Sequence, residues 1–123
     1  MTSSAPALTF TPTALSYGVI NVGSSCALAT YHVANASQSY ATVENHSICM
    51  VPSVNADEMD TESWLFVSNA TGSGYCNSSN ETPGGTIAQG ASEVETHKIV
   101  VPASPSTSGT VYFIIRHRYQ YTG

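Results

Sequence analysis

Charge is scarce in this sequence. Only 9% of its 123 residues are Asp, Glu, Lys or Arg, against about a quarter in average domains. The three basic residues are Lys98, Arg116 and Arg118, and the formal net charge is −5. Nucleic-acid binding needs Lys and Arg clustered against the phosphates, so this composition argues against nucleic acid as a partner. Low charge instead suits an antiparallel β-protein, or a protein packed within an assembly.

Long hydrophobic runs are also absent. No apolar stretch approaches the ~20 residues of a membrane span. The first residues, MTSSAPALTF, show neither the basic region nor the apolar region of a secretory signal. We therefore expect no membrane partner, and a chain made in the cytoplasm of its host without a signal peptide.

Motifs for catalysis and cofactor binding are missing as well. There is no G-x-S-x-G nucleophile elbow and no glycine-rich phosphate loop. The three cysteines form no C-x-x-C pair, which argues against a thiolate metal site. We expect reduced thiols, with one disulfide as the alternative in an oxidising medium. The four histidines lie in separate segments, and only a metal site assembled from them in space stays open. We expect no enzyme activity, no cofactor and no metal.

What the sequence has in plenty is period-two alternation of apolar and polar residues, which predicts β-strands. The alternating segments are 8–10, 15–19, 27–33, 41–43, 94–101 and 111–119. Apolar runs at 48–51 and 64–67 predict two further strands, the second a central core strand that contains Trp64. Clusters of Gly, Pro, Asn and Ser at 21–25, 35–39 and 105–109 predict turns.

Two segments and the last strand need separate interpretation. Residues 54–63 contain an acidic patch, which we expect to be a loop, with a single helical turn as the alternative. Residues 68–90 predict a long irregular loop and are the first candidate for a recognition surface. The closing strand is predicted to be buried in its first half and to project beyond the core afterwards. One of its faces carries Tyr112, Ile114, Arg116 and Arg118, and the other carries Val111, Phe113, Ile115, His117 and Tyr119.

The opening of the chain resembles a known family. The pattern F-x-P-x-x-L-x-Y-G-x-x-x-V-G-S-S, followed by an apolar strand that ends in V-x-N, is similar to the start of ASH-type immunoglobulin-like modules (abnormal-spindle/hydin-like, choice-of-anchor D). The matching residues are Phe10, Pro12, Leu15, Tyr17, Gly18, Val22, Gly23, Ser24, Ser25, Val33 and Asn35. The end of the chain matches loosely, and residues 48–90 do not align. The resemblance implies an immunoglobulin-like fold but little about function, because such modules serve as spacers and docking surfaces in unrelated settings.

These patterns together predict a single all-β domain. The expected fold is an immunoglobulin-like antiparallel β-sandwich of about seven or eight strands. We divide the chain into an N-terminal arm at 1–7, the sandwich at 8–119 with its long loop at 68–90, and a C-terminal tail at 120–123.

Three functions fit the sequence. The first is a non-enzymatic structural protein of a large assembly, most concretely a decoration (cement) protein on the capsid surface of a tailed-phage virion. Its partner would be the major capsid protein or another virion protein, and a homo-oligomer, for instance a trimer, is expected. The second is a bacterial surface or adhesion module. The third is a carbohydrate-binding or hydrolytic domain, with Trp64, Tyr75 and the acidic loop lining a site. The expected partner-binding residues are Tyr75, Arg116, Arg118 and Tyr119.

Overall fold

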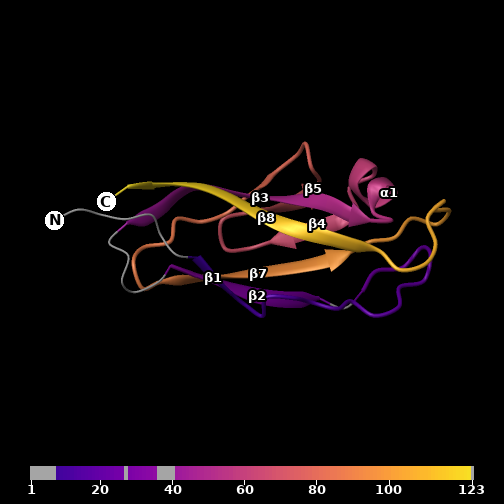
Figure 1. Cartoon of the computed structure of the whole chain (residues 1–123), viewed down its shortest axis with the longest axis horizontal. Helices are drawn as coiled ribbons and strands as arrows, with labels where there is room; N and C mark the ends of the chain where they lie inside the picture. Colours follow the sequence, from indigo (N-terminus) through magenta and orange to yellow (C-terminus); the bar gives the residue numbers. More distant parts are fainter. Residues whose placement is uncertain (1–7, 27, 36–40, 123) are drawn as a thin grey trace.

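The computed structural model describes residues 8–26, 28–35 and 41–122. The predicted N-terminal arm at 1–7, most of the predicted turn at 35–39 and the last residue of the predicted tail lie outside the described residues. Within them the chain forms two antiparallel sheets, of five and three strands, and one short helix (Figure 1). The prediction of an all-β sandwich is confirmed.

The five-stranded sheet has the order β1-β2-β7-β4-β5, and the three-stranded sheet the order β6-β3-β8. The two outer strands β5 and β6 come from consecutive parts of the chain, so the segment between them passes from one sheet to the other. Helix α1 follows β3 directly. The bounds are β1 Leu8–Thr11, β2 Ala29–Asn35, β3 Thr42–Val54, α1 Asp57–Thr61, β4 Leu65–Ser68, β5 Ser73–Cys76, β6 Thr82–Pro83, β7 Ser92–Ile99 and β8 Tyr112–Thr122.

Strands β1 and β2 confirm the alternation predicted for them. Tyr31 and Val33 are buried, whereas Thr30 and His32 between them are exposed. The strand predicted at 15–19 is wrong, because residues 12–24, all of them described, form no strand. Gly18 takes a positive φ of 70° in the middle of this segment, a conformation that interrupts an extended chain.

Strand β3 joins two predicted strands into one strand of 13 residues. The polar residues 44–47, which separate the two predicted strands, form a bulge in β3, and Asn45 in this bulge has a positive φ of 49°. The predicted strand at 48–51 stops before Pro52, but β3 continues to Val54. The neighbouring β6 pairs only with Ser47 and Ile48, so the missing N–H of Pro52 lies where β3 has a second irregularity and no strand on that side.

The predicted loop at 68–90 is more regular than expected. It contains β5 and β6, and the turn before β5 is closed by Asn69, whose Oδ1 accepts hydrogen bonds from the N–H groups of Thr71 and Gly72. The acidic patch forms the single helical turn of the alternative interpretation. Glu58 of this helix accepts hydrogen bonds from the N–H groups of Ser106 and Thr107, which ties the helix to the turn before β8.

The interior divides into two apolar clusters. The larger contains Trp64, which is buried and donates its indole N–H to Glu62 Oε1 over 3.0 Å. The predicted core strand that follows it, β4, lies second from the edge of its sheet and is not central. The larger cluster consists of Ile48, Met50, Met59, Trp64, Leu65, Val67, Cys76, Ile99 and Val101. The smaller cluster consists of Tyr31, Val33, Val43 and Ile87.

Candidate functional site

The predicted partner-binding residues fall on two different sheets. Arg116, Arg118 and Tyr119 lie on β8, and Tyr75 lies on β5 at the edge of the other sheet. Tyr119 is directed to the inner side of β8 and packs against the smaller apolar cluster, while both arginines are on the exposed face. The structure therefore brings only the two arginines together.

Strand β8 lies at an edge of its sheet and pairs only with β3 among the described residues (Figure 1). Its outer face is Tyr112, Ile114, Arg116 and Arg118. Tyr112 and Ile114 are 59% and 56% exposed, so the expectation that the first half of this strand is buried is wrong for the outer face. The inner-face residues Val111, Phe113 and Ile115 are partly buried and pack against the core. The residues predicted as a tail are also different from expectation, because β8 continues through residue 122.

Tyr75 belongs to an aromatic group on the outer face of the five-stranded sheet. Its ring meets that of Phe66 edge-on, with centroids 5.1 Å apart. The Lys98 ammonium lies 5.4 Å from the centre of the Phe66 ring, which is a cation–π distance. Lys98 is thus engaged within the chain, as is Arg118, which forms an ion pair with Glu81.

A group of buried titratable side chains lies between the two sheets, and the sequence interpretation missed it. We call this group the polar belt and define it as Tyr17, Tyr31, His46, Glu93, Glu95, His97 and His117. Its main contributor is β7, in the middle of the five-stranded sheet. The alternation on β7 was predicted, but the face that points inward is the polar one: Glu95 and His97 are 0% exposed, whereas Val94 is 45% exposed.

A chain of polar contacts crosses the belt from one sheet to the other. The Tyr31 hydroxyl on β2 is hydrogen-bonded to His117 Nε2 on β8 over 2.6 Å. His117 Nδ1 is hydrogen-bonded to His46 Nε2 on β3, also over 2.6 Å. His46 Nδ1 then lies 3.1 Å from the Gly85 carbonyl oxygen and 3.2 Å from Glu93 Oε2 on β7. A proton on Nδ1 therefore serves both oxygens.

Two glycines allow this arrangement, because the backbone before residue 86 runs directly over the belt. A Cβ atom at Gly84 would lie 2.3 Å from His46 Nδ1, and one at Gly85 would lie 3.0 Å from Glu93 Oε1. The Gly85 N–H donates to Glu93 Oε1 over 2.8 Å. Both glycines lie in the segment predicted as a long loop, and here they permit close approach of the backbone to the belt.

Glu93 and Glu95 stand side by side on the inner face of β7. Asn69 donates to Glu95 Oε1 over 2.8 Å. The second oxygen of each carboxyl group, Oε2, is buried. For Glu93 the nearest donor to this oxygen is His46 Nδ1, and for Glu95 there is none among the described residues. The two carboxyl groups can therefore satisfy each other when Glu95 is protonated and donates to Glu93.

The surroundings move the pKa values of the belt in opposite directions. Burial, together with the charge of Glu93, raises the pKa of Glu95 from 4.5 to about 7. Burial also opposes ionisation of Glu93, but hydrogen bonds from His46 and the Gly85 N–H keep its pKa below 4.5. For His46, burial is outweighed by the hydrogen bonds to Glu93 and Gly85, and its pKa rises above 6.5. Burial lowers the pKa of His97, and of His117 beside His46, to about 4.

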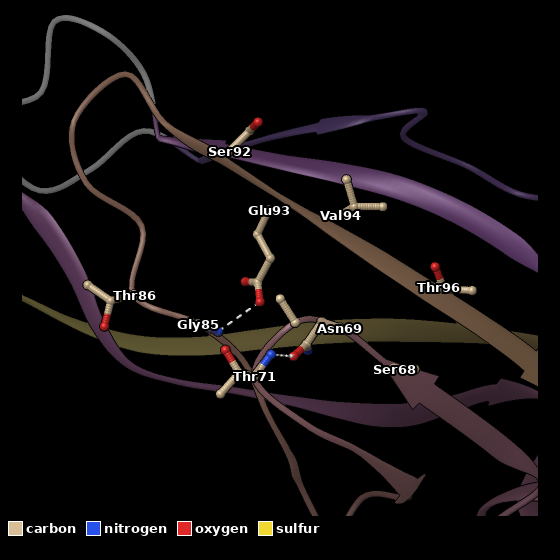
Figure 2. A pocket seen from close by; sticks show the side chains of 10 residues that line it. Ser68, Asn69, Thr71, Gly85, Thr86, Ser92, Glu93, Val94 and Thr96 are labelled. Carbon is tan, nitrogen blue, oxygen red and sulfur yellow. Dashed lines mark hydrogen bonds between the residues drawn. The ribbon is translucent and has the colours of Figure 1, made fainter.

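The belt meets a notch in the surface beside Glu93 (Figure 2). Pairing of β7 with β4 ends where Ser68 lies opposite Thr96, so the first residues of β7 extend beyond the end of β4. The resulting notch has a volume of about 560 Å³. Figure 2 shows the Glu93 side chain directed from β7 toward Gly85 across this space. Most of the lining is hydroxyl or amide: Ser68, Asn69, Thr71, Thr86, Ser92 and Thr96.

This geometry limits the chemistry that the site can perform. Glycoside hydrolysis uses two carboxyl groups on opposite sides of the scissile bond, whereas Glu93 and Glu95 share one face of one strand and Glu95 is inaccessible. Trp64 and the acidic helix do not line this notch. Trp64 and Tyr75, which were predicted to line a site with the acidic segment, do meet Glu62 of that segment in a separate pocket of about 300 Å³. Three of the four histidines do meet in the belt, yet no group of three or more His, Cys, Asp or Glu among the described residues is arranged to hold a metal ion.

Comparisons with known proteins give no further guide to the site. No family model, no curated protein and no solved structure matches the chain. The similarity to ASH-type modules stays a prediction from the sequence. No helix in the described part of the chain has the length and apolar character needed to cross a membrane.

Proposed function

We propose that this chain is a non-enzymatic structural protein of a large assembly, and most concretely a decoration protein that binds the outer surface of a tailed-phage capsid. The observation that carries the proposal is strand β8, which has 11 residues and lies at a sheet edge with an exposed outer face. In this proposal the chain is made in the host cytoplasm and ends in the virion.

An open edge of this length favours docking by strand addition. Edge strands present unpaired N–H and C=O groups, and an extended segment of a partner can satisfy them. On β8 these groups run beside Tyr112 and Ile114, two large apolar side chains that are more than half exposed. Full burial of such a side chain contributes roughly 1.5–3 kcal/mol, so covering its exposed half contributes roughly half as much. Arg116 next to them adds a charge that orients the partner without contributing much affinity.

The composition supports the same function. A surface with so few charges can pack against neighbours without desolvating many ions. On a capsid, a decoration protein contacts repeated copies of one subunit, and modest contacts add through multivalency. The partner that we propose is the major capsid protein, and a second copy of this chain across β8 is the competing occupant.

The direct test is co-sedimentation with capsids of the phage that encodes the chain, purified without their decoration protein. Ile114→Asp and Arg116→Glu alter the outer face of β8. Their matched controls are Val94→Asp and Lys98→Glu, which make the same changes on the outer face of the other sheet. Loss of about 2 kcal/mol at a central contact weakens binding roughly 30-fold. We expect that loss for Ile114→Asp and full binding for both controls. Equal binding by all four variants, or none by the natural chain, contradicts the proposal.

One observation favours a second function, a glycan-binding module. The notch beside Glu93 is lined mainly by hydroxyl and amide groups, which suit a neutral polyhydroxylated ligand. A glycan array separates the two functions. A glycan-binding module should give a signal that Ser92→Val or Thr96→Val abolishes, whereas a decoration protein should give no such signal.

A further inference from the structure

The polar belt contains two direct polar side-chain contacts between the two sheets. His46 on β3 contacts Glu93 on β7, and His117 on β8 contacts Tyr31 on β2. At the outer strands, the Thr82 hydroxyl on β6 donates to the Gly74 carbonyl oxygen on β5, and the two apolar clusters also lie between the sheets. The belt therefore determines how strongly β3 and β8 are held against the five-stranded sheet at this position.

The charge on His46 decides whether Glu93 has a counterion. A protonated His46 donates from both ring nitrogens, to Glu93 and to His117. A neutral His46 keeps one N–H donor, on Nδ1. His117 Nδ1 can then donate to His46 Nε2, and the Tyr31 hydroxyl can donate to His117 Nε2. What is lost is the positive charge beside Glu93, which leaves a carboxylate that is 10% exposed without a partner of opposite charge.

Only protons can neutralise the belt. The three Lys and Arg residues of the chain are elsewhere: Lys98 over Phe66, and Arg116 and Arg118 on the outer face of β8. The carboxyl pair needs one proton on Glu95, since two adjacent buried carboxylates repel each other. His46 needs a second. The other titratable members of the belt are Tyr17, Tyr31, His97 and His117, and Cys76 lies beside the belt.

We propose that the polar belt is a proton-operated latch between the two sheets. One proton on the Glu93–Glu95 pair and one on His46 fasten β3 and β8 to β7 and β2. Loss of these protons above neutral pH places uncompensated negative charge between the sheets and allows β8 to open. The latch acts whatever partner β8 binds, so it goes beyond the function proposed above.

The directions of the pKa shifts agree with this geometry. The pKa of Glu95 at about 7 places its deprotonation near neutral pH, and hydrogen bonds to Glu93 and Gly85 raise the pKa of His46 above 6.5. Burial raises the pKa values of Tyr17, Tyr31 and Cys76 and lowers those of His97 and His117. These five groups therefore stay neutral while the latch releases, and they do not compensate for its charge.

Hydrogen exchange of the full chain tests the latch. Exchange is followed at about pH 6 and about pH 8.5 and expressed as protection factors, which remove the intrinsic effect of pH. We expect β8 amides to lose protection at the higher pH, roughly tenfold for each pH unit of this window that lies between the unfolded and folded pKa of a latch group. For Glu95 this is the unit between pH 6 and its folded-state pKa of about 7. Glu95→Gln keeps a hydrogen-bond donor toward Glu93 without a titrating proton, and should retain most of that protection. His32→Gln, at an exposed position of β2, should behave as the natural chain does.

Three results would overturn the latch. The first is unchanged protection of β8 in the natural chain between the two pH values. The second is a loss of protection in Glu95→Gln as large as in the natural chain. The third is protection of β8 at pH 8.5 equal to that of β4 and β5, because β8 then opens only by global unfolding. A His46→Gln variant should show low protection of β8 at both pH values, and if it does not fold, the Glu95→Gln comparison decides alone.

Discussion

The belt predicts an unusual dependence of stability on pH, with a maximum near pH 6.5. His97 and His117 have folded-state pKa values of about 4, below 6.5 in the unfolded chain. Their contribution to stability is complete above pH 6.5 and is lost as the pH falls toward 4. Glu95 has a folded-state pKa of about 7, above its unfolded value of 4.5. Its contribution, and that of His46 with its raised pKa, is present at lower pH and is lost as the pH rises.

The magnitude follows from counting protons. Between pH 4.5 and 6.5 the unfolded chain binds two more protons than the folded chain, at His97 and His117, and one fewer, at Glu95. The net difference of one proton over two pH units lowers the free energy of unfolding by about 2.7 kcal/mol at the acid end. Above pH 6.5 the folded chain binds more protons, at Glu95 and His46, so stability falls again. Below pH 4.5, protonation of Glu93 adds to the acid loss.

Urea unfolding at half-unit pH intervals measures this curve, and two variants test its origin. His97→Gln removes one of the two acid-side protons, so the slope between pH 4.5 and 6.5 should vanish. Glu95→Gln removes the opposing proton, so the slope should double to about 2.7 kcal/mol per pH unit. Stability that rises or falls steadily through pH 6.5, or a Glu95→Gln slope equal to that of the natural chain, would refute the assignment of protons to the belt.

Two further predictions concern packing around the belt and the thiols. Gly84→Ala places a Cβ 2.3 Å from the His46 ring and should lower the free energy of unfolding by roughly 1–3 kcal/mol. Gly74→Ala, whose Cβ would meet nothing closer than 3.8 Å, should change it much less in the same urea experiment, and equal effects would contradict the close-approach argument. Native-state labelling with a thiol reagent at pH 8 should modify the half-buried Cys26 before the buried Cys49 and Cys76, since burial also raises the pKa of Cys76 to about 12. Faster labelling of Cys76 than of Cys26 would contradict this burial pattern.

The strands that could be predicted are those whose signal is local. Alternation at 27–33, 94–101 and 111–119 gave β2, β7 and β8, because side chains on a strand point to opposite faces whatever their partner is. The same signal failed at 15–19, where Gly18 has a positive φ and the segment connects β1 to β2 without pairing with a strand. Strands β5 and β6 were missed since short pairings inside a glycine-rich segment depend on the neighbouring strand more than on composition.

The belt could not be predicted because its members come together only in the folded chain. His46 and His117 are 71 positions apart, and Tyr31 and His117 are 86 positions apart. One signal in the sequence was available. Glu93, Glu95 and His97 occupy one face of a strand in the middle of an apolar domain, and a strand in that position is covered on its inner side whichever residues it carries. Alternation identifies two faces but does not say which one is buried.

The composition gives the belt its significance. A chain with only 8 acidic residues places two of them, and three of its four histidines, between its sheets. Apolar residues of similar volume at such positions are often as stabilising or more so. The hydrogen bonds of the belt compensate for part of the burial of these groups, since His97 Nε2 has no partner among the described residues, and the protonation that they require holds only over a narrow range of pH. A core built in this way makes proton binding part of the cohesion between its sheets. The same strand that presents the open edge, β8, carries on its inner face the histidine that closes the chain to Tyr31.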